Sequence, residues 1–354
     1  MTWNAFSNEG RSRPAPFRSS NMSSSPNGLK LSLWNWRENS IVNELTVRGY
    51  CWKRDGKVLA VAVNAQPGEP SQQSALLQFL STDTWEVLHE QEISVRAGDG
   101  TIEMEFSPDG RLLAVVEHNF ELDRRGITCF SAQDGKRENR VDWRSSTISN
   151  LDWHPDSTSI AAITMDGLVF KWNMSEGSLA ESSTETWMRS VRWDRQGEHI
   201  VVAGNHAVRW LAGDTLESTQ HWLLADARVV AMHGDALIAG TESSVVHFEP
   251  KNFPVRQLKH EPSSRDSSVP PIHWSPDGQL VAFVSGDSPT SIWDASSGAS
   301  YFASGLGCTI IGASLGWLDN ERFASYYRDE LTITDRNASH LIQTLTLPSN
   351  SPRL

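Results

Sequence analysis

One serine of this sequence has a spacing that could support nucleophilic catalysis. Gly312, Ser314 and Gly316 match the G-x-S-x-G pattern of hydrolases, in which the serine hydroxyl attacks a carbonyl carbon. That chemistry requires a strand, a sharp turn and then a helix, so that the hydroxyl is exposed at the turn. Here the motif continues into Leu315-Gly316-Trp317, which has the pattern of a β-strand. We therefore expect no nucleophile elbow and no catalytic residues.

The side chains that could bind a metal ion are dispersed along the chain. The 11 histidines are scattered, and no HExxH motif, Walker-type loop or Cys-x-x-Cys pair occurs. Cys51, Cys129 and Cys308 cannot all pair with one another, so we expect buried free thiols. His118 and Asp123 lie near each other, but no second ligand group stands beside them. The sequence therefore predicts no metal site and no cofactor.

The charge of the chain argues against general binding to nucleic acid. The 354 residues include 43 acidic and 31 basic side chains, which gives a formal net charge of -12. Nucleic-acid binding depends on Lys and Arg that neutralise phosphates, and an acidic protein offers few of these. No apolar run approaches the roughly 18 residues that a membrane-spanning helix needs, and the start of the chain does not resemble a secretory signal. We expect a cytoplasmic protein that associates with no membrane.

Residues 1–28 differ in composition from the rest of the chain. They are rich in Ser, Pro and Arg and show neither helical nor strand periodicity. We expect a disordered N-terminal arm, and its positive charge could contact phosphate or an acidic protein. A transit peptide is the alternative, although the amphipathic helix that it needs is not visible. Residues 349–354 are expected to form a short C-terminal tail.

A strand–turn–strand unit recurs through the remaining sequence, at the spacing of about 40–45 residues that is typical of propellers. Each copy has an alternating apolar strand, a polar turn and a second apolar strand. Two clear turns are Ser107-Pro108-Asp109-Gly110 and Ser275-Pro276-Asp277-Gly278. Proline presets φ and glycine accepts a positive φ, so these residues close a tight hairpin. The first strand of the copies ends at Trp52, Phe106, Trp153, Trp193, Met232, Trp274 and Trp317.

A third strand and an outer strand follow each hairpin, with no helical pattern between them. This order excludes alternating strands and helices and predicts an all-β fold, a β-propeller of seven blades with four antiparallel strands each, over residues 29–348. Two longer spacings predict hairpin insertions at 64–74 and 118–125. Residues 29–47 have the pattern of a third and an outer strand alone. We expect them to lie beside the last blade as a clasp that hides open sheet edges.

The sequence resembles the WD40-repeat β-propeller family. The resemblance is carried by Phe106-Ser107-Pro108-Asp109-Gly110, by Trp274-Ser275-Pro276-Asp277-Gly278 and by Trp293-Asp294, and it covers roughly residues 30–348. The Trp-Ser-Pro-Asp-Gly string also occurs in TolB-type and peptidase-associated propellers. The chain departs from the WD40 pattern because no Gly-His pair precedes its first strands. Packing between blades, by the tryptophans at the strand ends, is therefore expected to replace a histidine-based network.

The resemblance implies a non-catalytic scaffold or adaptor for protein–protein interaction. In similar proteins, partners dock on the loops that lead into each first strand and that link the second strand to the third. Trp143 and Trp187 lie in the segments of this chain that match those loops. For both side chains, packing on the adjacent blade is the alternative to a role in binding. We expect protein partners, and a monomer outside a complex. The predicted partner-binding residues are Trp143, Arg144, Trp187, Asp226 and Arg228.

Two other functions stay open at this stage. An enzyme or small-molecule binder that uses the central channel of the propeller would need polar groups that converge at the starts of the strands. A propeller associated with nucleic acid would need a basic stripe, which the acidic body of the chain does not show.

Overall fold

The computed structural model consists of β-strands and their connections. No helix occurs in the part of the chain that the structure describes. The described residues are 2–6, 29–35, 40–65, 74–95, 102–119, 124–143, 147–184, 187–234, 236–241, 244–248, 254–259, 272–283, 291–302, 314–317, 319–327, 330–336 and 341–346.

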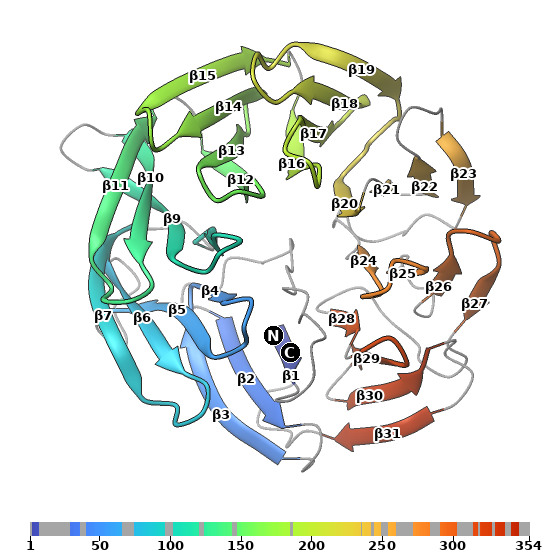
Figure 1. Cartoon of the computed structure of the whole chain (residues 1–354). Coiled ribbons are helices and arrows are strands. Elements are labelled where there is room, and N and C mark those ends of the chain that lie inside the picture. The colour runs from blue at the N-terminus through green and yellow to red at the C-terminus, as the bar shows by residue number, and fades with distance from the viewer. Residues whose placement is uncertain are drawn as a thin grey trace. The chain divides into compact units, whose positions relative to one another are not determined.

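Seven sheets contain four strands each, and the strands follow chain order across each sheet (Figure 1). Neighbouring strands pair antiparallel. The predicted seven blades of a β-propeller are thereby confirmed. The first four blades are β4 (Gly49–Trp52), β5 (Val58–Asn64), β6 (Ser74–Ser81), β7 (Val87–Ser94); β8 (Met104–Phe106), β9 (Leu112–Asn119), β10 (Arg124–Ser131), β11 (Arg137–Trp143); β12 (Ile148–Trp153), β13 (Ser159–Thr164), β14 (Leu168–Asn173), β15 (Ser178–Ser183); and β16 (Met188–Trp193), β17 (His199–Gly204), β18 (Ala207–Ala212), β19 (Ser218–Leu223).

The last three blades have the same strand order. They are β20 (Val229–His233), β21 (Ala236–Gly240), β22 (Ser244–Phe248), β23 (Pro254–Lys259); β24 (Ile272–Trp274), β25 (Leu280–Phe283), β26 (Ser291–Asp294), β27 (Ser300–Phe302); and β28 (Ser314–Trp317), β29 (Arg322–Tyr327), β30 (Glu330–Asp335), β31 (Leu341–Thr346).

An eighth sheet has three strands, β1 (Thr2–Phe6), β2 (Leu29–Asn35) and β3 (Ser40–Val47), in that order. Strand β1 pairs parallel to β2 and contacts β28. The expectation of a disordered arm is therefore wrong for residues 2–6, whose Thr, Trp and Phe favour strands. Within the predicted clasp, residues 29–35 and 40–47 belong to this separate sheet and do not extend the last blade, which already has four strands. The other residues of the predicted arm and the tail at 349–354 lie outside the described residues.

The predicted turns between first and second strands are present with the expected geometry. Gly110 and Gly278 have φ values of 71° and 70°, and each donates its backbone N–H to the serine carbonyl three residues earlier. Within each turn the serine hydroxyl donates to the aspartate carboxylate, at 2.6 Å for both Ser107–Asp109 and Ser275–Asp277. The Ser-Pro-Asp-Gly sequence therefore closes the hairpin through its own side chains.

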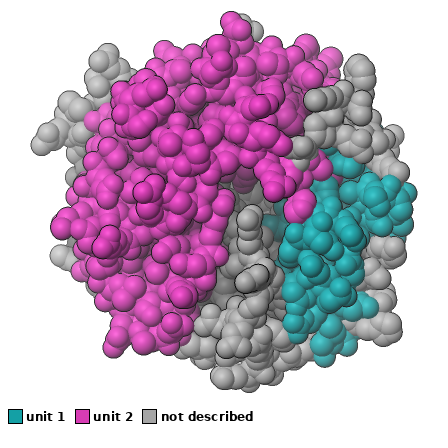
Figure 2. Space-filling view, viewed as in Figure 1, with its two compact units in different colours: residues 1–21, 31–45, 242–354 teal, residues 22–30, 46–241 magenta. Residues whose placement is uncertain are grey.

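The chain divides into two compact units, coloured separately in Figure 2: residues 1–21, 31–45 and 242–354 form unit 1, and residues 22–30 and 46–241 form unit 2. In unit 2 the first strands β4, β8, β12, β16 and β20 neighbour one another in sequence order (Figure 1). Apolar side chains fill the space between adjacent blades. One cluster joins Trp153 to residues of the preceding blade, and another joins Met188 and Trp193 to β13 and β14.

The tryptophans at the ends of the first strands are buried, as predicted. Two of them also join blades through a hydrogen bond. The Trp153 indole donates to the carbonyl oxygen of Glu105 at 2.9 Å, and the Trp317 indole donates to that of His273 at 3.2 Å. In both cases the acceptor is the middle residue of the first strand in the preceding blade. The tryptophan at the end of a first strand thus fills the space between two blades and fixes the alignment of their first strands.

Candidate partner-binding face

The structure separates the two tryptophans predicted to bind a partner. Trp187 lies immediately before β16 and is 56% exposed. Trp143 ends β11 and is only 6% exposed, and its ring stacks on Phe170 of the next blade with centroids 4.3 Å apart and planes 13° from parallel. The position of Trp143 corresponds to the packing alternative, and its ring is too buried to contribute to an exposed surface. Arg144 lies outside the described residues.

Asp226 and Arg228 form an ion pair in the connection from β19 to β20. The Arg228 Nε donates to Asp226 Oδ2 at 2.6 Å, and the Arg228 side chain is 6% exposed. Asp226 has a positive φ of 55°, a conformation that aspartate tolerates better than most residues. The pair therefore fixes the path of this connection, and Arg228 is too buried to offer its charge to a partner.

Asn205 joins three connections of the fourth blade. It lies in the short turn between β17 and β18, and its N–H donates to the carbonyl oxygen of Trp187 at 3.2 Å. Its own carbonyl oxygen accepts the N–H of Asp226 at 2.7 Å, and its side-chain Oδ1 accepts the Nε of Arg189 at 3.3 Å. The Asn205 turn thus anchors the backbone of Trp187, while the indole ring of Trp187 is exposed.

The glycine before this turn allows the close approach. A Cβ atom at position 204 would collide with the carbonyl oxygen of Trp187 and would crowd the sulfur of Met188. A residue with a side chain would therefore push the Trp187 segment away from β17.

A β-bulge sets the direction of Arg189. The pairing of β16 with β17 shifts between Met188 and Ser190, so Arg189 is the extra residue. The preceding blade has a bulge at the same place, with Ser149 between the paired residues Ile148 and Asn150 of β12. Bulges re-aim side chains that would otherwise follow the strand alternation. At Arg189 the result is a partly exposed guanidinium that reaches the Asn205 turn.

Two further exposed apolar side chains lie at the same edge of these blades. In an antiparallel sheet of consecutive strands, the connection into the first strand and the turn from the second to the third share one edge. Met165, 46% exposed, occupies such a turn, and its N–H donates to Thr147 just before β12. Leu223, 86% exposed, ends β19, and the next residue, Leu224, bonds to the His206 carbonyl. Met188 packs with residues that flank the Met165 turn.

We refer to the side chains gathered at this edge as the Trp187 face: Met165, Trp187, Arg189, Asn205, His206 and Leu223. Trp187 is the one member of this face among the residues predicted from the sequence to bind a partner. Asn205 could have been found from its place in a two-residue turn, where asparagine is favoured. Arg189, Met165 and Leu223 carry no such signal, because bulges and exposure depend on neighbouring strands.

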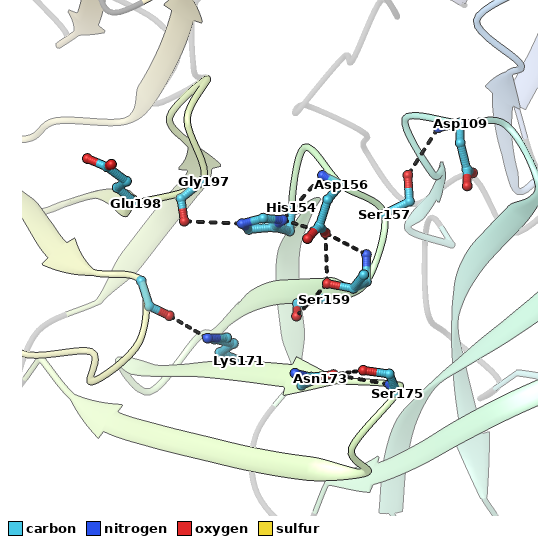
Figure 3. A network of polar contacts seen from close by, with 12 residues as sticks. Asp109, His154, Asp156, Ser157, Ser159, Lys171, Asn173, Ser175, Gly197 and Glu198 are labelled. Carbon is cyan, nitrogen blue, oxygen red and sulfur yellow. Dashed lines mark hydrogen bonds and ion pairs between the residues drawn. The ribbon is translucent and has the colours of Figure 1, made fainter.

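The opposite edge of the same blades holds a polar network that links consecutive turns (Figure 3). The Ser157 hydroxyl accepts the N–H of Asp109 at 3.1 Å, so the turn of one blade is tied to that of the next. His154 Nε2 lies 3.1 Å from the Gly197 carbonyl, and its Nδ1 lies 2.5 Å from Asp156. The Asp109–Ser157 and His154–Gly197 contacts join neighbouring blades without the Gly-His pair of the WD40 pattern.

The groups with reactive potential have structural positions. Ser314 begins strand β28, and the G-x-S-x-G motif continues into that strand. Cys51 and Cys129 are buried thiols, and burial raises the pKa of the Cys129 thiol. Cys308 lies outside the described residues. Among the residues that the structure describes, no group of three or more His, Cys, Asp or Glu could hold a metal ion, and no helix could span a membrane.

Three curated proteins are similar to parts of the chain, whereas no protein-family model matches it. The chain is 27% identical over 159 residues to WD repeat-containing protein slp1 of Schizosaccharomyces pombe, covering 42% of this chain and 31% of that protein. It is 24% identical over 199 residues to the transcriptional corepressor LEUNIG_HOMOLOG of Arabidopsis thaliana, covering 54% and 24%. It is 29% identical over 109 residues to WD repeat-containing protein 1 of Bos taurus, covering 29% and 17%. The chain thus spans less than a third of these relatives.

A solved structure covers more of the chain. The C-terminal WD40 domain of Sif2 superposes with a TM-score of 0.63 over 82% of this chain and 81% of that one, at 14% sequence identity. At this identity the likeness shows the fold alone.

Proposed function

Because the chain is a WD40-repeat β-propeller, we propose that it is a non-catalytic scaffold that binds a protein partner through the Trp187 face. The observation that carries the proposal is a large aromatic side chain that is more than half exposed on a fixed backbone. Tryptophan is among the residues most enriched at the energetic centres of interfaces. An exposed apolar group that is held rigidly gains contact area on binding without a large loss of conformational entropy.

The surroundings of Trp187 also fit an interface. Met165 and Leu223 add exposed apolar surface at the same edge, and the turn of Asn205 and His206 adds polar groups there. Interfaces commonly combine an apolar centre with a polar rim. The proposal includes a cytoplasmic location and a monomeric chain outside the complex.

The bonds at the first strands favour this function over a small-molecule site in the channel. Asn150 Oδ1 accepts the N–H of Val191 at 3.0 Å, and Asp152 Oδ2 accepts that of Trp193 at 2.7 Å. These polar side chains of β12 are thus engaged in joining two blades.

The test is a comparison of three versions of the full chain, each immobilised and exposed to lysate of the source organism. Trp187→Ala removes the aromatic group from the face. Leu179→Ala, on the outer strand β15 of the neighbouring blade, removes a comparably exposed apolar side chain elsewhere. We expect proteins that the wild type and Leu179→Ala retain and that Trp187→Ala loses. The proposal is wrong if all three retain the same proteins or if none exceeds bare resin.

A further inference from the structure

We infer that Arg189 makes the Trp187 face selective for an acidic protein segment, in which an Asp or Glu side chain pairs with the guanidinium while a nearby apolar side chain packs on Trp187. This inference rests on the proposed function and names the chemistry of the partner. It concerns a residue that the sequence pattern did not single out.

The terminal N–H groups of the Arg189 guanidinium bond to no acceptor among the described residues. Its Nε donates to Asn205 Oδ1, and no described carboxylate forms an ion pair with it. The acidic group of the adjoining connection, Asp226, is already paired with Arg228. Two other arginines of unit 2, Arg137 and Arg140, by contrast both pair with the buried carboxylate of Glu117. Among the residues that the structure describes, no carboxylate therefore matches the positive charge of Arg189, which lies two residues after the exposed Trp187.

The bond to Asn205 orients the remaining donors. An arginine has five N–H groups in a rigid fork, and a carboxylate can accept two of them at once. With Nε bound to Asn205, the two terminal nitrogens remain for a ligand. Because Asn205 also binds the backbone of Trp187, the cation and the aromatic ring are held by the same turn. A segment that carries a carboxylate close to an apolar side chain matches this pair of groups.

The preceding blade carries no charge at the equivalent position. The equivalent bulge in the preceding blade carries Ser149, whose hydroxyl donates to the Ile163 carbonyl at 3.3 Å. The chain as a whole has a net charge of -12, which repels an acidic segment at long range. Such repulsion is screened at physiological salt beyond about 8 Å, so the local cation decides the preference. A single substitution at position 189 should therefore be sufficient to change it.

The experiment is a selection of a random peptide library, displayed on phage, against the full chain and its variants. We expect the wild type and the Leu179→Ala control to enrich peptides in which Asp or Glu stands within a few residues of a bulky apolar residue. Arg189→Glu should reverse the preference toward Lys or Arg. Arg189→Gln, which keeps a donor for Asn205 and loses the charge, should enrich apolar residues without a charge preference.

A synthetic peptide from the wild-type selection then gives the size of the effect by fluorescence anisotropy. Charge-assisted hydrogen bonds are worth about 1.5–3 kcal/mol, which corresponds to roughly a 10- to 150-fold weaker Kd for Arg189→Gln. Arg189→Lys should recover part of the affinity, because lysine supplies the charge without the fork. Thermal unfolding of each variant identifies any that fold poorly.

The outcomes separate the two proposals. Selection that depends on Trp187 but shows no preference for acidic residues, or that Arg189→Glu leaves unchanged, overturns the role of Arg189 and leaves the scaffold standing. No selection that depends on Trp187 overturns both.

Discussion

At the residue scale, we expect the substitution of tryptophan by alanine to have opposite consequences at Trp143 and Trp187. Trp143 is buried against Phe170, so Trp143→Ala should leave a cavity and lower the free energy of unfolding by about 3–5 kcal/mol. Trp187 is largely exposed, so Trp187→Ala should change that free energy by less than about 0.5 kcal/mol. Urea unfolding followed by circular dichroism compares the variants, and equal losses would contradict the assignment of the two positions.

The sequence could not separate these residues, because what buries Trp143 lies in another blade. Both tryptophans stand among polar residues at the edge of a strand, and this pattern placed both in the loops of the expected face. Phe170, which covers Trp143, belongs to β14 of the next blade. By contrast, the tryptophans at the ends of first strands could be assigned to the core, since their alternation with apolar neighbours repeats in each blade.

At the scale of elements, the fit of the Asn205 turn against the Trp187 segment predicts a specific defect. Gly204→Ala places a methyl group against the Trp187 carbonyl oxygen, so the segment must shift. We expect a loss of about 1–3 kcal/mol in stability, as for other overpacked sites, together with loss of the partner. His206→Ala, an exposed residue of the same turn, is the control and should keep wild-type stability. An unchanged unfolding curve for Gly204→Ala would show that the segment yields without cost.

The strands and hairpins were predictable, because alternation and turn residues are local signals. The pairing of β1 with β2 was not predictable, because it is parallel and its two strands are far apart in the sequence. The 22 residues between them lie outside the described part of the chain. Parallel pairs require a long connection, and a sequence gives no local sign of which strand will lie alongside. The bulge at Arg189 was missed for a related reason: an extra residue is visible only when the partner strand is known.

At the scale of the whole molecule, aspartates repeated in the turns predict how stability depends on pH. For each of them burial acts to raise the pKa, but hydrogen bonds outweigh it and lower the pKa below the usual 3.8. These bonds come from serine, threonine, histidine or arginine side chains and from backbone N–H groups of the turn. The carboxylates are Asp109, Asp156, Asp277, Asp294 and Asp319.

A carboxyl whose pKa is lower in the folded state binds its proton more readily when unfolded. Its stabilising contribution is complete above pH 3.8 and is lost as the pH falls through the folded pKa. Because the turns recur in both units, the free energy of unfolding of the whole molecule should decrease as the pH drops below about 4. Urea unfolding by tryptophan fluorescence between pH 7 and pH 3 measures this slope, and the Asp109→Asn, Asp277→Asn double variant should reduce it. Stability that stays constant to pH 3, or a variant with the wild-type slope, would mean that the turn carboxylates do not govern acid unfolding.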